Sequence, residues 1–161
     1  MKNPPEGIVK EYLKKCFLFS QLSNGELDEV IAVSKYEDAD KNEMIFLKDL
    51  GEPDQMYVIL EGSVRISRSS EEGREITLDT LGTADIFGEI SLFDGGMRTA
   101  DAMATEKSRF LVIHRHDLIL FLENHFQVAI KLLAAISRKL RATDVFLEDV
   151  LLRKLSERLA K

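Results

Sequence analysis

Cysteine is nearly absent from this sequence, which has one such residue, Cys16, among 161. A single cysteine excludes an internal disulfide and any all-cysteine metal or iron–sulfur site within one chain. It is also typical of a reducing compartment, so we expect a cytoplasmic protein. Long apolar runs are missing too: even Leu118 to Leu122 is far too short to cross a membrane. The N-terminal residues MKNPPEG also lack the apolar segment of a secretory signal.

Catalytic and metal-binding motifs are missing as well. The sequence contains neither the G-x-S-x-G elbow of hydrolases nor a P-loop, so we expect no enzymatic activity. His114-Arg-His116 has the H-x-H form of cupin-type metal sites, but Glu123 and His125 lie too far along the chain to complete one. We therefore expect no bound metal, and a metal-dependent cupin-like enzyme is the least favoured alternative.

Positive charge is also in short supply. The chain has 22 Lys and Arg against 28 Asp and Glu, a net charge of −6, which argues against non-specific binding to nucleic acid. Residues 138–161 differ, with seven basic side chains against four acidic ones. We interpret this basic stretch as a solvated helix face. We expect no membrane partner and no direct DNA binding by this chain.

The sequence does contain enough apolar material for one globular domain, with 45% hydrophobic and 31% charged residues. Short strand-like segments, several of them alternating with period two, occur between about residues 44 and 112. Glycine, proline and acidic residues separate these segments. Because no helix-length periodic segment interrupts them, the pattern predicts an antiparallel sandwich or barrel.

Helices are predicted on both sides of this β region. Apolar residues from Ile8 to Cys16 share one helix face, and Ser23 with Glu26 has the form of a capping box before a second helix. Asp117 is expected to cap a third helix. A longer helix is predicted from about Phe126 to the end of the chain, because the segment contains no glycine or proline.

This last helix carries an apolar heptad pattern. Spacings of 3 and 4 alternate and then shift, which predicts a short coiled coil. The residues concerned are Leu133, Ile136, Leu140, Thr143, Leu147 and Val150, followed by Leu151, Leu155 and Leu159. We expect a homodimer through this helix, and a helix packed only on its own domain is the alternative.

The chemically informative segment is Phe87–Ala100, with the sequence FGEISLFDGGMRTA. Residues 89–92 are predicted to form a short helix whose free N–H groups attract an anion. Arg98 supplies a guanidinium suited to phosphate oxygens, and Thr99 adds a hydroxyl. Glu89 is an acceptor suited to ribose hydroxyls. The combination favours a nucleotide phosphodiester, with a structural Glu–Arg ion pair across the turn as the alternative.

Four motifs then occur in one order: LFSQLS from Leu18, MYVILEGSV from Met56, LGTADIFGE from Leu81 and RTA from Arg98. Together they resemble the cyclic-nucleotide-binding domains of the catabolite-activator and protein-kinase regulatory-subunit superfamily, over about residues 13–144. The resemblance implies an α+β fold, mainly β: an antiparallel β-roll or jelly-roll with N-terminal helices and a long C-terminal dimerisation helix. It divides the chain into residues 1–125, the β-roll with its N-terminal helices, and 126–161, the helix expected to act as ligand lid and dimer coiled coil.

The resemblance also implies which residues bind the ligand. Phe87–Ala100 matches the phosphate-binding cassette of the family, and the ligand-binding residues expected within it are Gly88, Glu89, Ile90, Arg98, Thr99 and Ala100. In it Glu89 would accept the ribose 2′-hydroxyl, and Arg98, helped by Thr99 and backbone N–H groups, would pair with the cyclic phosphate.

Residues outside the cassette are assigned in the same way. Ile66 and Leu78 match sheet positions that wall the base and sugar. Thr143 matches the position of the long helix that meets the base. Asp144 matches its neighbour, which contacts the ligand of the other subunit.

Departures from the family pattern carry expectations of their own. Ala84 stands where many members have glycine, so we expect a different turn there. Phe126 follows His125 where a proline is common, so we expect the last two helices to run together. The sequence also stops where bacterial activators continue into a helix-turn-helix DNA reader.

The sequence thus predicts a non-enzymatic sensor of a cyclic nucleotide, with cAMP favoured, cGMP left open and no further cofactor. Ligand binding would shift the population of the C-terminal helix and thereby signal to an unknown effector protein. Two alternatives stay open. One is the sensor part of a CRP/FNR-type transcription regulator whose DNA-binding domain is absent from this chain, and the other is a ligand-free scaffold dimer.

The heptad pattern generates a first testable prediction. Leu140→Glu should convert a dimer into a monomer, because each chain would bury a charge facing its twin. Light scattering at high micromolar concentration measures the mass directly. A wild-type monomer under these conditions would contradict the predicted coiled coil.

Overall fold

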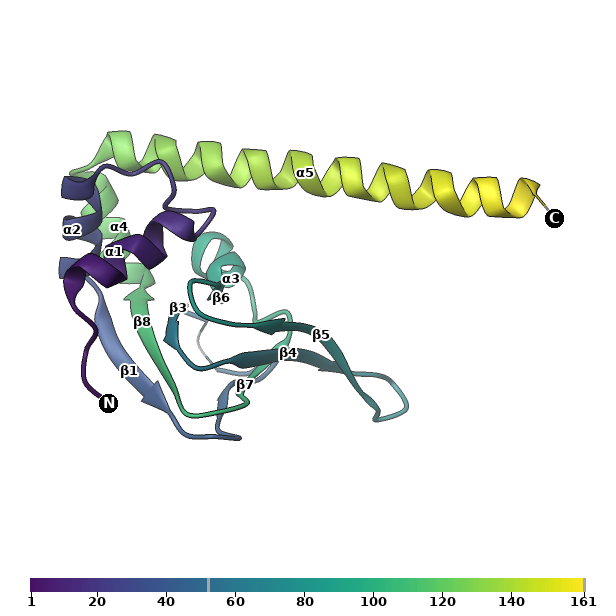
Figure 1. Cartoon of the computed structure of the whole chain (residues 1–161), viewed down its shortest axis with the longest axis horizontal. Helices are drawn as coiled ribbons and strands as arrows, with labels where there is room; N and C mark the ends of the chain where they lie inside the picture. Colours follow the sequence, from purple (N-terminus) through teal and green to yellow (C-terminus); the bar gives the residue numbers. More distant parts are fainter. Residues whose placement is uncertain (52, 161) are drawn as a thin grey trace.

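The strands of the computed structural model form two four-stranded antiparallel sheets within the part of the chain that it describes, residues 1–51 and 53–160. One sheet has the order β1-β8-β3-β6 and the other β2-β7-β4-β5, and together they make a roll (Figure 1). The strands are β1 (Lys35–Ala39), β2 (Met44–Phe46), β3 (Gln55–Glu61), β4 (Val64–Ser69), β5 (Glu75–Leu81), β6 (Ile86–Phe87), β7 (Asp101–Ala104) and β8 (Ser108–His114).

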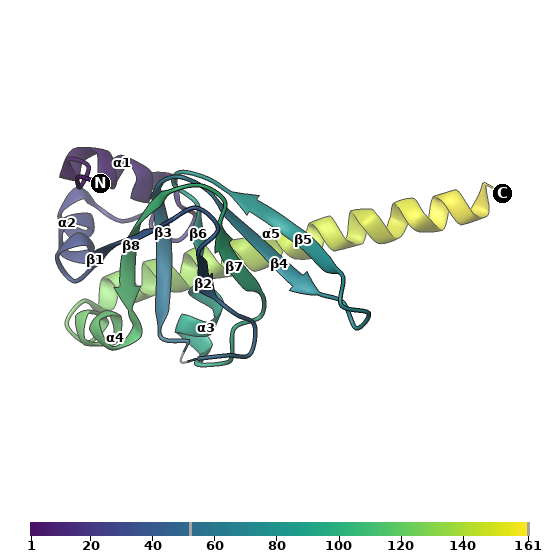
Figure 2. The same ribbon diagram turned by 90° about the horizontal axis from the view of Figure 1, so that it is seen from below.

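The helices gather at one end of the roll and along one of its sides. They are α1 (Glu6–Lys15), α2 (Asn24–Ala32), α3 (Glu89–Asp94), α4 (Arg115–Glu123) and α5 (Phe126–Leu159). Figure 2 shows α5 passing across the roll and projecting beyond it. The predicted β-roll with N-terminal helices and a long C-terminal helix is therefore confirmed. No helix in the described ranges is both long and apolar enough to span a bilayer.

Strand β3 is buried on both faces and joins two hydrophobic cores. Met56, Val58 and Leu60 point toward the helices, while Tyr57 and Ile59 point into the roll. Strand β8, its neighbour in the sheet, alternates in the same way. The short apolar segments at Met56–Leu60 and at Phe110 and Val112 were predicted to be strands, and both predictions are confirmed.

The first turns of α5 belong to the helical core. Val128 and Leu132 are buried in that core, which also holds residues of α1, α2 and α4, and Ala135 is buried one turn farther along. The capping box predicted for α2 is present: the Glu26 N–H donates to the Ser23 hydroxyl, and the Ser23 N–H donates to the Glu26 carboxylate. The packing of Val128 and Leu132 in the helical core fixes where α5 begins relative to the sheets.

Three local expectations were wrong. Helices α4 and α5 do not run together, because His125 leaves the helical conformation at φ −136°. Its ring stacks on Phe121 and lies 2.9 Å from a Glu29 carboxylate oxygen, which holds the break. Helix α4 begins at Arg115, so Asp117 lies in its first turn and does not cap it.

The third wrong expectation concerns Ala84, which was expected to change the turn before the cassette. Ala84 instead adopts φ 71°, the left-handed conformation that favours glycine. Two hydrogen bonds hold it there: its N–H donates to the Ile59 carbonyl, and its carbonyl accepts the Cys16 thiol. Burial raises the pKa of that thiol to about 12, so Cys16 stays protonated and can donate.

The left-handed backbone conformation of Ala84 leads to a prediction about stability. Ala84→Gly should raise the free energy of unfolding by roughly 0.5–1 kcal/mol, because glycine adopts this conformation without the Cβ penalty. Ala142→Gly, at an exposed position of α5, is the matched control and should lower stability by about 1 kcal/mol. Urea denaturation measures both. A loss of stability in Ala84→Gly would contradict the strain assigned to this residue.

Candidate functional site

A buried arginine organises the site. Arg98 is only 4% exposed, and its Nη1 donates to the Gly88 carbonyl and the Ser91 hydroxyl at 3.1 and 2.8 Å. Its Nη2 donates to the Gln55 carbonyl at 2.7 Å, and the guanidinium lies over the Phe46 ring. Burial lowers the pKa of Arg98, but an arginine remains a cation in proteins.

Neutral groups make all of these contacts. Among residues 1–51 and 53–160, Arg98 forms no ion pair with a carboxylate. The structural alternative of a Glu89–Arg98 ion pair is therefore wrong. A buried cation without a counter-ion is costly, because hydrogen bonds to neutral groups offset only part of the lost hydration.

The backbone at Gly88 makes room for this guanidinium. Gly88 has φ 79°, and an added Cβ would lie 2.8 Å from Nη1 of Arg98 and 3.0 Å from the Gln55 carbonyl oxygen. Only glycine fits both the conformation and the space. Gly88 also precedes α3, the short helix that the sequence predicted at 89–92, and α3 carries Ser91 to Arg98.

Glu89, the first residue of α3, is half-buried beside Arg98. Burial raises the pKa of its carboxyl above the ordinary value. Its own backbone N–H and the positive charges of Lys139 and Arg98 act in the opposite direction without cancelling the rise. Glu89 thus places hydrogen-bond acceptor oxygens close to the Arg98 guanidinium without forming an ion pair with it.

These groups line a cavity of about 400 Å³, a volume in the range of small-molecule sites. Its wall is formed by the cassette, by Ile66 of β4, by Asp79 and Leu81 of β5, and by Phe17 and Lys139 from the helical side. The cavity therefore combines two cations with several carboxylates around an apolar wall.

Most of the predicted ligand-binding residues meet in this cavity. The lining includes Gly88, Glu89, Ile90, Arg98, Thr99, Ala100 and Ile66. Leu78, Thr143 and Asp144 are not among the lining residues. Thr143 and Asp144 are exposed on α5 beyond Lys139, and Leu78 is 51% exposed on β5.

A break in strand pairing explains the position of Leu78. Ile66 pairs with Asp79 and Ser67 pairs with Thr77, so Leu78 is the extra residue of a β-bulge. A bulge interrupts the alternation of faces, so Leu78 does not share the face of Ile66. Asp79 takes the place in the cavity wall that the sequence assigned to Leu78.

Sequence reasoning missed Phe17, Asp79 and Lys139 as lining residues. Lys139 was detectable, because it lies four residues before Thr143 and therefore on the same helix face. Its carbonyl accepts the Thr143 hydroxyl at 3.0 Å. Asp79 had no signal, since the bulge that places it is invisible in the residue pattern.

The histidines lie apart from the cavity lining. His114 ends β8, with its Nε2 3.4 Å from the Gln55 side-chain nitrogen, and His116 lies in the first turn of α4. No group of three or more His, Cys, Asp or Glu side chains suited to a metal ion occurs within the described ranges.

The raised pKa of Glu89 predicts a pH-dependent stability difference. The folded chain holds this proton more tightly than the unfolded chain, so the contribution of Glu89 to stability is present at low pH and lost as the pH rises through the raised value. Glu89→Gln should therefore raise the melting temperature at about pH 7 and leave it nearly unchanged at about pH 4.

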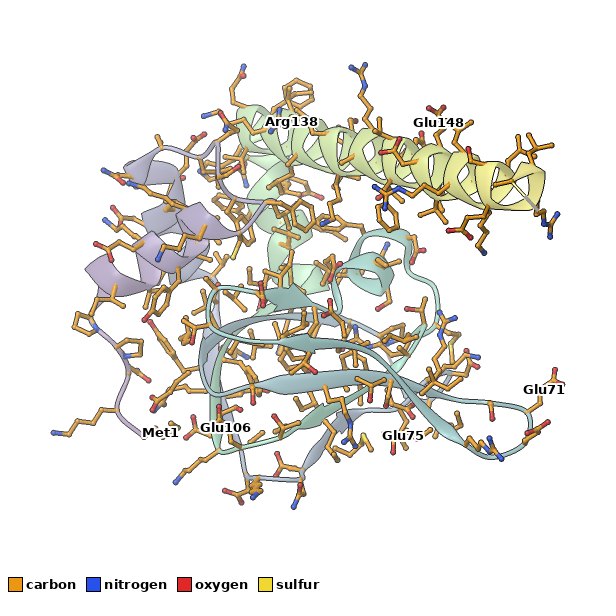
Figure 3. The ribbon with its side chains drawn as sticks, turned by 45° about the vertical axis from the view of Figure 1, so that its right-hand side comes forward. Met1, Glu71, Glu75, Glu106, Arg138 and Glu148 are labelled. Carbon is orange, nitrogen blue, oxygen red and sulfur yellow. The ribbon has the colours of Figure 1, made fainter. Side chains whose placement is uncertain are left out.

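Thermal unfolding at the two pH values measures this difference. Glu106→Gln is the control, because Glu106 is exposed in the turn between β7 and β8, far from the cavity (Figure 3). It should change neither melting temperature appreciably. A destabilised Glu89→Gln at about pH 7 would show that the ionised carboxylate supports the fold.

Known proteins with related sequences include a bacterial transcription regulator and a bacterial cyclic AMP receptor protein. The sequence profile of the cyclic nucleotide-binding domain matches residues 37–125. A "CRP-like cAMP-activated global transcriptional regulator" of Mycobacterium tuberculosis is 36% identical over 112 residues, 69% of this chain and 50% of that protein. A "Cyclic AMP receptor protein" of Thermus thermophilus is 34% identical over 132 residues, 81% of this chain and 60% of that protein.

A solved structure agrees with these matches. The N-terminal domain of a transcriptional regulator from Streptomyces coelicolor A3(2) superposes with a TM-score of 0.78 at 32% identity, covering 84% of this chain and 94% of that one. The chain therefore spans only 50 and 60% of the length of the M. tuberculosis and T. thermophilus proteins. The family predicted from the motifs is confirmed, and the chain belongs to the cyclic nucleotide-binding domain family.

Proposed function

We propose that this chain is a non-enzymatic cAMP sensor that binds its ligand in the cavity around Arg98. The observation that carries the proposal is the buried guanidinium of Arg98, which has only neutral hydrogen-bond partners among the described residues. A cyclic phosphate brings the single negative charge that this cation lacks. The names of the relatives from M. tuberculosis and T. thermophilus support cAMP as the nucleotide.

The rest of the cavity suits the other parts of a nucleotide. The half-buried Glu89 carboxylate would accept the ribose 2′-hydroxyl, because an ionised carboxylate accepts hydrogen bonds and repels phosphate. Ile66 and Leu81 offer apolar contact to the sugar and base. The exposed Thr99 hydroxyl and the backbone N–H groups at the start of α3 would complete the phosphate contacts.

Helix α5 would change its position when a ligand binds in the cavity. Its first turns are anchored in the core, and Lys139 farther along lines the cavity and lies over the Phe17 ring. A ligand that contacts Lys139, and Thr143 one turn beyond it, would favour one position of the helix over others. This is a population shift, in which the ligand changes the helix only through its differential affinity for the two positions.

The exposed face of α5 supports a homodimer in this scheme. Leu133, Leu140 and Leu147, spaced by seven residues, are 59, 62 and 51% exposed in the single chain. A parallel partner helix would cover them. Asp144 would then lie near the cavity of the partner, in the role that the sequence resemblance assigned to it.

A second candidate function is the sensor part of a transcription regulator. The related M. tuberculosis protein carries such a name, and this chain covers 50% of its length. In such a protein α5 would pass the ligand signal to a DNA-binding domain. A ligand-free scaffold is less favoured, because a scaffold would gain nothing from burying Arg98 without a counter-ion among residues 1–51 and 53–160.

Three variants test the proposed roles of Arg98 and Glu89. Arg98→Ala should weaken cAMP binding by roughly 2–5 kcal/mol, because the ligand phosphate would be desolvated without a partner. Glu89→Gln should cost roughly 1.5–3 kcal/mol, the range for a hydrogen bond to a charged group. Arg98→Lys keeps the charge but loses the forked geometry, so it should recover only part of the affinity.

Isothermal titration calorimetry with cAMP and 2′-deoxy-cAMP separates the two roles. The loss in Glu89→Gln should largely vanish with the deoxy ligand, because the hydroxyl that Glu89 serves is already absent. Arg98→Ala should weaken both ligands alike. If Glu89→Gln weakened the deoxy ligand as much as cAMP, Glu89 would be a structural residue of the cassette and its assignment to ribose would be wrong.

A further inference from the structure

The β-bulge in β5 gives the cavity an acidic side chain that has no role in the function proposed so far. Because Leu78 is the extra residue of the bulge, Asp79 pairs with Ile66 and shares its face of the sheet. Asp79, Ile66 and Leu81 all line the cavity. Bulges often aim a side chain at a binding site, and here the aimed group is a carboxylate.

Asp79 lies at the end of the cavity away from the phosphate-binding arginine. Ile66 pairs with Asp79 on one side and with Ala102 of β7 on the other, so two strand spacings, about 10 Å, separate Asp79 from β7. The residues that lead into β7 are Arg98, Thr99 and Ala100. A nucleotide whose phosphate meets Arg98 would therefore extend its base toward Asp79.

The Asp79 carboxylate can accept a hydrogen bond from a ligand. Its Oδ1 accepts the backbone N–H of Thr80 at 2.9 Å, which orients the group. Its other oxygen has no hydrogen-bond partner within the described ranges, and the carboxylate forms no ion pair there with Lys139 or Arg98, the two cations of the cavity wall. An ionised carboxylate can only accept, so its ligand partner must be an N–H or O–H donor.

The proposed function leaves one such donor. The phosphate is an anion, which a carboxylate repels, and the ribose hydroxyl is assigned to Glu89. The remaining donor of cAMP is the exocyclic amino group at position 6 of adenine. We propose that Asp79 accepts a hydrogen bond from this amino group and so selects the base, an inference that rests on the proposed function.

A pair of ligands that differ only at this group tests the inference. The first is cAMP, and the second is purine riboside 3′,5′-cyclic monophosphate, in which hydrogen replaces the amino group. The wild-type chain should bind cAMP about 3- to 10-fold more tightly, the contribution of one hydrogen bond at a solvent-accessible position. Asp79→Ala should bring this ratio close to one. Asp79→Asn keeps an acceptor oxygen and should retain part of the preference.

The control removes the same charge elsewhere on the strand. Glu75 lies on the β4–β5 hairpin, on the side away from α5, and pairs with Arg65 (Figure 3). Glu75→Gln changes the net charge as Asp79→Asn does, so any general effect on an anionic ligand appears in both. Only the Asp79 variants should change the ratio between the two ligands.

The outcomes separate this inference from the proposed function. If cAMP binds and Arg98→Ala abolishes binding, but Asp79→Ala weakens both ligands by the same factor, Asp79 shapes the cavity without selecting the base and the inference is overturned. A wild-type ratio of one overturns it too. If the wild-type chain binds neither ligand, the proposed function fails and the inference fails with it.

Discussion

The burial of one guanidinium is the constraint on which the site depends. Arg98 is held by carbonyl oxygens of Gln55 and Gly88 and by the Ser91 hydroxyl, so β3, the turn before α3 and α3 itself all converge on it. Gly88 must be a glycine because a Cβ would occupy the space of the guanidinium. The cation is thus placed and oriented before any ligand arrives, and this preorganisation lowers the entropic cost of binding an anion.

The same strand links this site to the long helix. One face of β3 packs inside the roll and the other packs against the helices, where α5 begins. Helix α5 then reaches the cavity through Lys139 and continues beyond the roll with its leucines exposed (Figure 1). In the proposed function, a ligand in the cavity would therefore act on a helix that is anchored at one end and has exposed leucines along the other.

Features that follow a local residue pattern were predicted from the sequence, whereas features that depend on tertiary contacts were not. The capping box at Ser23, the cassette around Arg98 and the apolar run of β3 depend on local residue types, so the sequence alone identified them. Strand β1 was missed because its charged residues, KYEDA, resemble a loop until they pair with β8 at the edge of a sheet. The bulge at Leu78 and the helix break at His125 depend on tertiary contacts that no local pattern encodes.

A crystal structure of the chain grown with cAMP is the most direct test of the central claim. The account expects the cyclic phosphate within hydrogen-bond distance of the Arg98 guanidinium, with the ribose 2′-hydroxyl on Glu89. A nucleotide bound away from the cassette, with Arg98 still bonded only to Gln55, Gly88 and Ser91, would contradict it.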